Sequence, residues 1–175
     1  MSSRSDGPTG KSGKGSKGGK SGKGKGGKAK SAPDLHPIDY AVLDTLVDGQ
    51  HANPHEVLGP HQYDHGVTIR VLRPAATSVD VIIGDERIPM VHEFRGVWQT
   101  VIDNPEVPDY RLSVSYGGDP LPADDPYRFL PTLGEVDVHL ITEGRHEQLW
   151  KVLGAHKHIY DSINGPIHGV SFAVW

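Results

Sequence analysis

The first 31 residues contain no valine, isoleucine, leucine or aromatic residue. They repeat lysine, glycine and serine, and they carry nine basic side chains against one acidic one, a net charge of +8. Such a segment buries too little apolar surface to offset the entropy of ordering its backbone, about 1–2 kcal/mol per residue. The sequence therefore predicts a disordered basic tail over residues 1–33 and restricts any core to the rest of the chain.

The remainder of the chain differs from this tail in charge and composition. It carries nine basic and 21 acidic side chains, a net charge of −12, and it holds all 11 histidines. The chain has no cysteine, which excludes a disulfide framework, a thiolate nucleophile and a zinc–thiolate site. It has no apolar run near the roughly 20 residues that span a bilayer, and its N-terminus lacks the apolar stretch of a secretory signal. We therefore expect a cytoplasmic protein with no membrane partner.

The apolar periodicity changes from helical to β-type along the chain. Residues 39–48 place apolar side chains on one helical face, with Asp39 near the start and Gly49 at the end. A loop is expected over residues 50–61. Beyond it, alternating apolar residues separated by glycine and proline turns indicate an all-β, immunoglobulin-like antiparallel β-sandwich with short flanking helices. The predicted strands are 67–72, 79–83, 88–94, 97–102 and 110–116, with Pro89 suggesting an edge.

The second half of the chain divides less clearly. We expect the sandwich module to occupy residues 34–130, followed by a linker over residues 131–168 with a short helix at about 146–153. Apolar residues alternate again from Gly169 to the last residue. Residues 169–175 are therefore predicted to be the first strand of a second, truncated sandwich module.

Five segments, in order and spacing, resemble the amino-terminal region of the bacterial 1,4-α-glucan (glycogen) branching enzymes. The resemblance runs from about Ile38 to the last residue and does not include the basic tail. The segments are Asn53–His61, Asp124–Phe129, Asp137–Leu140 with Glu143 and Gly144, Leu153–His156, and Gly165–Trp175.

The resemblance implies a first module of the glycogen-binding type and a second such module beginning near Gly169. In the family these precede a (β/α)₈ barrel of the α-amylase class, which forms α-1,6 branches by retaining glucosyl transfer with two carboxylates. No residue of this chain aligns with either carboxylate. We therefore expect an α-glucan partner, no catalytic residue, and no activity without the catalytic domain.

Two alternatives to glucan binding stay open. The module could set domain packing without touching sugar, or the lysine-rich tail could bind a polyanion by neutralising phosphates without sequence preference.

Candidate sugar-binding residues are aromatic, because a ring can cover the apolar side of glucose while neighbouring polar groups bind its hydroxyls. Trp98, Tyr110 and Tyr116 are the candidates. Trp98 shares its strand face with Thr100 and Ile102. Packing in the core is therefore the alternative for Trp98, and the two tyrosines have the same ambiguity.

We interpret one acidic pair and the clustered histidines as structural residues rather than as catalytic or metal-binding ones. Asp124 and Asp125 precede a proline in a loop, so we expect them to cap turns and pair with Arg128 rather than act as catalytic carboxylates. The clustered histidines lie on segments interrupted by proline and glycine, and no metal or cofactor is expected. These histidines are His51, His55, His61, His65, His156 and His158.

Overall fold

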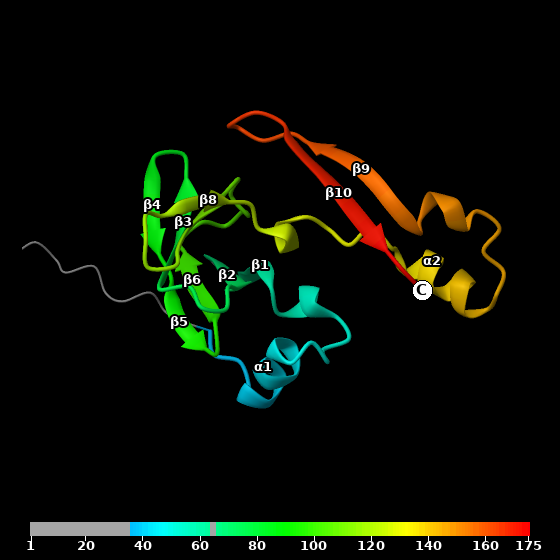
Figure 1. The fold of residues 1–175 in the computed structure, drawn as a ribbon, viewed down its shortest axis with the longest axis horizontal. Helices are drawn as coiled ribbons and strands as arrows, with labels where there is room; N and C mark the ends of the chain where they lie inside the picture. The colour runs from blue at the N-terminus through cyan, green and yellow to red at the C-terminus, as the bar shows by residue number, and fades with distance from the viewer. Residues whose placement is uncertain (1–35, 64–65) are drawn as a thin grey trace, which may run out of the picture. The chain divides into compact units, whose positions relative to one another are not determined.

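The computed structural model describes residues 36–63 and 66–175 and shows an antiparallel β-sandwich, the class that the sequence predicts (Figure 1). The predicted basic tail, residues 1–33, lies entirely outside these residues. The elements of the first module are α1 (Tyr40–Val47), the 3-10 turn η1 (Pro54–Glu56), β1 (Gly59–Tyr63), β2 (Gly66–Leu72), β3 (Ser78–Ile83), β4 (Glu86–Pro89), β5 (Val91–Phe94), β6 (Val97–Ile102), β7 (Arg111–Ser115), β8 (Leu121–Ala123) and the 3-10 turn η2 (Pro126–Arg128).

Two four-stranded sheets make up the sandwich, with strand orders β1-β2-β6-β5 and β4-β3-β7-β8. Successive side chains of a strand point to opposite faces, so the alternating apolar residues of β2, β3, β6 and β7 meet between the sheets. Every side chain of this core is at most 8% exposed. The core residues are Val67, Ile69, Val71, Val79, Val81, Met90, Trp98, Ile102, Tyr110, Leu112 and Val114.

The single strand predicted over residues 88–94 is wrong, because the chain changes sheets in the middle of it. β4 ends at Pro89 and pairs with β3, whereas β5 begins at Val91 and pairs with β6. Proline has no N–H for a ladder bond, and β4 lies at a sheet edge as expected. Met90 between them is buried, and its N–H donates to the carbonyl oxygen of Val79 at 2.9 Å.

The predicted first helix is confirmed, and it covers the outer face of the first sheet. Asp39 caps it, its Oδ1 accepting the N–H of Ala41 at 2.9 Å. Leu43 and Leu46 of α1 pack against Val97 in a second apolar cluster. The segment 50–61, expected to be a loop, contains η1 and the start of β1 and contributes Val57 and Leu58 to that cluster.

The chain continues with α2 (Glu135–Thr142), the 3-10 turn η3 (Leu149–Lys151), β9 (Gly154–Tyr160) and β10 (Ile167–Ala173). β9 and β10 pair as an antiparallel hairpin. The helix predicted over 146–153 is wrong: a single 3-10 turn lies there, and α2 was not predicted. The strand expected from Gly169 begins at Ile167. The division into modules at residues 130 and 168 stays a prediction.

This second part repeats the opening of the first. α1, η1, β1 and β2 are followed in the same order by α2, η3, β9 and β10, and residues 39–61 align with residues 134–156 without a gap. Matching glycines adopt matching left-handed backbone angles, which glycine reaches at little cost. The paired φ values are +71° at Gly49 and +68° at Gly144, and +91° at Gly59 and +97° at Gly154.

The two copies also share hydrogen bonds and strand register. In each copy one histidine Nδ1 accepts a backbone N–H two residues later at 3.2 Å, and a second histidine Nε2–H donates to the carbonyl oxygen three residues before it. Gly59 pairs with Arg70 across the first hairpin, as Gly154 pairs with Ala173 across the second. The matching residues are His51, Asn53, Leu58 and His61 in the first copy and His146, Gln148, Leu153 and His156 in the second.

The copies differ in what covers their second strand. In β2, the side chains of Val67, Ile69 and Val71 point into the core and are fully buried. The matching side chains of the second copy are between 51% and 89% exposed. These are Val170, Phe172 and Val174, and together they are called the apolar stripe below.

We predict that Gly59→Ala destabilises the sandwich more than Gly117→Ala. Their φ values are +91° and +94°, so both alanines incur a similar left-handed strain, about 1–2 kcal/mol. A Cβ at residue 59 would lie 2.4 Å from the carbonyl oxygen of Tyr127, whereas nothing lies within 4 Å of one at residue 117. Urea unfolding should give the lower midpoint for Gly59→Ala. Equal midpoints would contradict the close packing of η2 on β1.

Candidate functional site

The three aromatic candidates lie in different environments. Trp98 and Tyr110 belong to the core, with 8% and 1% of their surface exposed, whereas Tyr116 is 55% exposed. A ring enclosed by other side chains has no free face for a sugar, so burial favours the packing interpretation of Trp98 and Tyr110. Sugar contact by the three residues stays a prediction.

The segment 124–129 is organised around a buried carboxylate. Asp125 is 0% exposed; its Oδ2 accepts the Tyr110 hydroxyl at 2.6 Å, and its Oδ1 accepts the Tyr127 N–H at 3.1 Å. The second bond caps η2, as expected of an acid at this place. Burial raises the pKa of the Asp125 carboxyl, and the hydrogen bonds from Tyr110 and Tyr127 oppose that rise.

The expected pairing of these acids with Arg128 is wrong. Asp124 pairs with Arg111 at 3.1 Å, and this carboxylate raises the pKa of the Arg111 guanidinium. Arg128 instead pairs with Asp109 and donates a second hydrogen bond to the carbonyl oxygen of Tyr110. The direction of Arg128 follows from η2, which turns its side chain back to the residues preceding β7. Sequence spacing alone does not reveal that turn.

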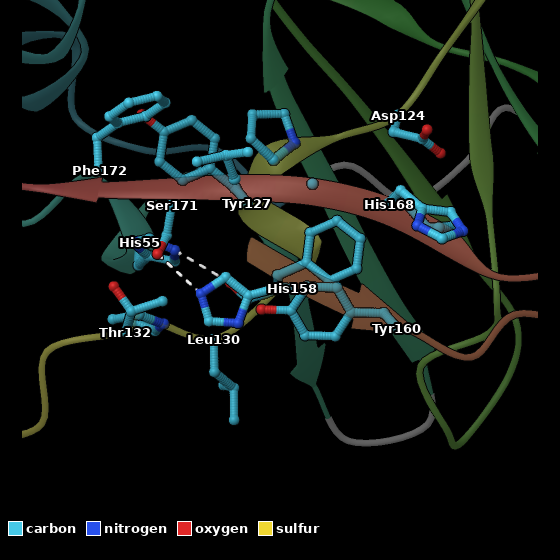
Figure 2. Close-up of a pocket in the computed structure, with 16 residues that line it drawn as sticks. His55, Asp124, Tyr127, Leu130, Thr132, His158, Tyr160, His168, Ser171 and Phe172 are labelled. Carbon is cyan, nitrogen blue, oxygen red and sulfur yellow. Dashed lines mark hydrogen bonds between the residues drawn. The ribbon is translucent and has the colours of Figure 1, made fainter. Parts of the chain in front are cut away.

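A groove of about 490 Å³ lies where segment 124–132 meets β9 and β10 (Figure 2). Aromatic rings form much of its wall. Phe129 stacks on Tyr160 of β9, with ring centroids 4.3 Å apart and planes 28° apart. Tyr127 contacts the ring of His55 edge to face at 4.9 Å. The His55 Nε2–H also donates to the carbonyl oxygen of Phe129 at 3.2 Å and so ties the wall to η1.

Polar groups lie beside these rings. In Figure 2 a dashed line joins His158 of β9 to Ser171 of β10, whose Nε2 and Oγ atoms are 2.8 Å apart. His168 and Asp124 lie on another part of the lining. Asp124 is the one carboxylate residue among the described residues that line the groove, and it forms an ion pair with Arg111. The groove therefore offers ring faces and hydrogen-bonding groups rather than the paired carboxylates of a glycosidase.

The groove was not predicted from the sequence, because its walls come from three distant segments. The polar and aromatic segment Tyr127–Phe129 was the available signal. Of the clustered histidines, His51, His61 and His156 bond to nearby backbone groups, while His65 lies outside the described residues. Within residues 36–63 and 66–175, no three His, Asp or Glu side chains come together as metal ligands would.

The same described ranges contain no helix with the length and apolar character needed to cross a bilayer.

Comparison with known proteins identifies what the chain is similar to. The family described as "alpha-1,4-glucan branching enzyme GlgB, N-terminal domain" matches residues 39–127. The 1,4-alpha-glucan branching enzyme GlgB of Mycobacterium ulcerans (strain Agy99) is 52% identical over 134 residues, which are 76% of this chain and 18% of that enzyme. The enzyme of the same name from Thermobifida fusca (strain YX) is 52% identical over 137 residues, 77% of this chain and 18% of that enzyme.

The chain thus spans about a fifth of the length of the curated relatives that it matches. Among solved structures, a pullulanase from Bacillus acidopullulyticus is 24% identical over 40% of this chain and 10% of that one, with a TM-score of 0.37. That likeness is too limited to bear on the fold.

We predict that Tyr110→Phe destabilises the protein by about 1–3 kcal/mol, because it removes a donor from a buried acceptor. Burial raises the pKa of Asp125, so its carboxyl group stays protonated to higher pH in the folded state than in the unfolded state. Ionising the carboxyl therefore reduces the free energy of unfolding as pH rises above the unfolded value of about 3.9. Losing the hydroxyl raises this pKa further, so the destabilisation should be larger near pH ~7 than near pH ~4.

Urea denaturation at both pH values measures this effect. Tyr116→Phe is the matched control, since Tyr116 is exposed. A loss of stability that is the same at both pH values would contradict the role given to the Asp125 carboxylate.

Proposed function

The chain belongs to the family of GlgB N-terminal domains, and on that premise we propose that it is a non-catalytic part of a 1,4-α-glucan branching enzyme that contacts the α-glucan. Its parent enzyme would form α-1,6 branches in cytoplasmic glycogen synthesis. The catalytic carboxylates would lie in another part of that enzyme. This chain alone should show no branching activity, and turnover in a branching assay would contradict the proposal.

The groove between segment 124–132 and the second hairpin is the observation that carries the glucan proposal. Glucose presents apolar faces edged by hydroxyls, and binding sites match it with aromatic rings and hydrogen-bonding side chains. Phe129 and Tyr160 provide stacked rings, one of them on a strand. His158 and Ser171 provide groups able to donate to or accept from hydroxyls. We place glucan contact here rather than at the buried Trp98.

A purely structural role is the second candidate, and the repeat of residues 39–61 in residues 134–156 favours it. The apolar stripe matches core positions of the first copy that are fully buried. We propose that β9 and β10 open a second sandwich module whose facing sheet covers this stripe. Its start would then be the repeat at Gly134, not residue 169. In this role the first module would fix the placement of the second.

A third candidate, polyanion binding through the lysine-rich tail, concerns residues outside the described part of the chain. It stays an alternative on the basis of charge alone.

We predict that the full chain is retarded in a native gel that contains glycogen, and that Tyr160→Ala reduces this retardation. Tyr160 is half-buried and stacks on Phe129, so its loss removes one ring and frees the other. Tyr116→Ala is the matched control, because it removes an exposed tyrosine outside the groove.

Tyr160→Ala and Tyr116→Ala distinguish glucan contact in the groove from glucan contact on the surface of the first sandwich. Loss of retardation in Tyr116→Ala alone would move the glucan site to the surface of the first sandwich. Unretarded wild-type protein would contradict glucan contact and favour the structural role. Circular dichroism of each variant checks that it is folded.

A further inference from the structure

The turn between β9 and β10 is held by a residue of the first sandwich. Asp109 lies just before β7, and its Oδ2 accepts two hydrogen bonds from that turn. The hydroxyl of Ser162 donates at 2.8 Å and the N–H of Ile163 at 2.6 Å. Ser162 in turn accepts the N–H groups of Asn164 and Gly165 through its hydroxyl and carbonyl oxygens. One carboxylate oxygen thus anchors an organised turn more than 50 residues away in the chain.

The other oxygen of Asp109 is bound to the first sandwich. Oδ1 pairs with the guanidinium of Arg128, and the side chains of Asp109 and Arg128 are 17% and 11% exposed. Arg128 lies over the rings of Tyr110 and Phe129, 5.4 and 5.2 Å from their centroids. Charge-assisted hydrogen bonds with limited exposure are stronger than neutral ones on an open surface. Asp109 therefore joins the turn to the cation that packs on the groove wall.

The charge state of Asp109 suits this role. Although partial burial raises the pKa of its carboxyl, the hydrogen bonds from Ile163, Ser162 and Arg128 lower it, with a net downward shift. The carboxylate is consequently ionised at neutral pH.

The repeat shows why this contact is specific to the second hairpin. The first hairpin turns between Tyr63 and Gly66, whereas the second runs to Tyr160 and resumes at Ile167. Their registers match at the other end, so the extra residues of the second copy lie toward its turn: seven residue pairs join β9 to β10, whereas five join β1 to β2, and the turn itself is longer. Those extra residues include the turn residues that Asp109 binds.

We propose that Asp109 is a positioning residue that locks the second hairpin to the first sandwich. Through Arg128 and the Phe129–Tyr160 stack, the same lock sets the spacing of the groove walls. The lock itself rests on the hydrogen bonds above, whereas its effect on glucan rests on the proposed function.

Amide hydrogen exchange of the full chain tests the lock. In Asp109→Ala, the amides of residues 163–165 should exchange at least about tenfold faster, while β2, β6 and β7 keep their protection. Asp109→Asn keeps an acceptor oxygen and should show a smaller increase. Asp85→Ala, in the exposed turn between β3 and β4, is the control. Unchanged exchange at residues 163–165 in Asp109→Ala would overturn the proposal.

A second variant covers the case in which Asp109→Ala loosens the whole sandwich. Ser162→Ala removes the hydroxyl bond to Asp109, together with the bond that the hydroxyl accepts from the Asn164 N–H, and leaves the Asp109–Arg128 pair in place. Faster exchange of the Ile163 amide, which Asp109 also binds, supports the lock in this variant, and no change at that amide overturns it.

Glycogen-gel retardation, measured in parallel, separates this inference from the proposed function. Reduced retardation of Asp109→Ala with a protected sandwich supports the positioning role. Unretarded wild-type protein contradicts glucan contact, while the exchange result still decides the lock.

Discussion

The buried contact between Tyr110 and Asp125 is the interaction on which the arrangement of the chain depends. A carboxylate without exposure is costly unless hydrogen bonds compensate it, and here a phenol from the core and a backbone N–H do so. The contact fixes η2 against the sandwich and brings the backbone of Tyr127 onto Gly59. From η2 the side chains of Arg128 and Phe129 extend to Asp109 and Tyr160. The segment 124–129 is therefore the junction between the two copies of the repeat.

The repeat gives the second half of the chain a physical explanation. A hairpin alone is marginally stable in water, and a sheet face of valine and phenylalanine is normally covered. In the first copy the facing sheet of β3 and β7 covers β2, whereas the matching apolar stripe of β10 is open. The tie at Asp109 and the stack at Tyr160 hold the opposite side of the hairpin. Segment 124–129 thus supports the second copy, and the groove lies beside that copy.

Much of the first module could be predicted from the sequence, because its signals are local. Alternation in β2, β3, β6 and β7 and the Asp39 cap of α1 required no knowledge of distant contacts. The prediction failed where tertiary contacts decide the structure. Residues 88–94 were predicted to form one strand, because alternation cannot show that Met90 bonds to Val79 while the chain changes sheets.

The same limit applies to the site and to the repeat. Arg128 was assigned to the nearest acids, although its partner Asp109 is brought to it by the fold. Residues of η1, η2, β9 and β10 line the groove, and no local sequence pattern indicates that these elements lie side by side. The repeat was visible in the sequence as two Val-Leu-Gly-x-His motifs. It was missed because the second hairpin has longer strands and a longer turn, which shift its later residues out of alignment with the first.

The central claim is that α-glucan contacts the groove at the junction of the two copies. Titration of the ¹⁵N-labelled chain with a linear maltooligosaccharide, followed by two-dimensional NMR, tests it most directly. We expect saturable shift changes at the amides of residues 126–132, in β9 and in β10, and steady positions for the core strands β3 and β7. Shift changes centred on Tyr116 and its neighbours, or none at millimolar sugar, would contradict glucan contact at the groove.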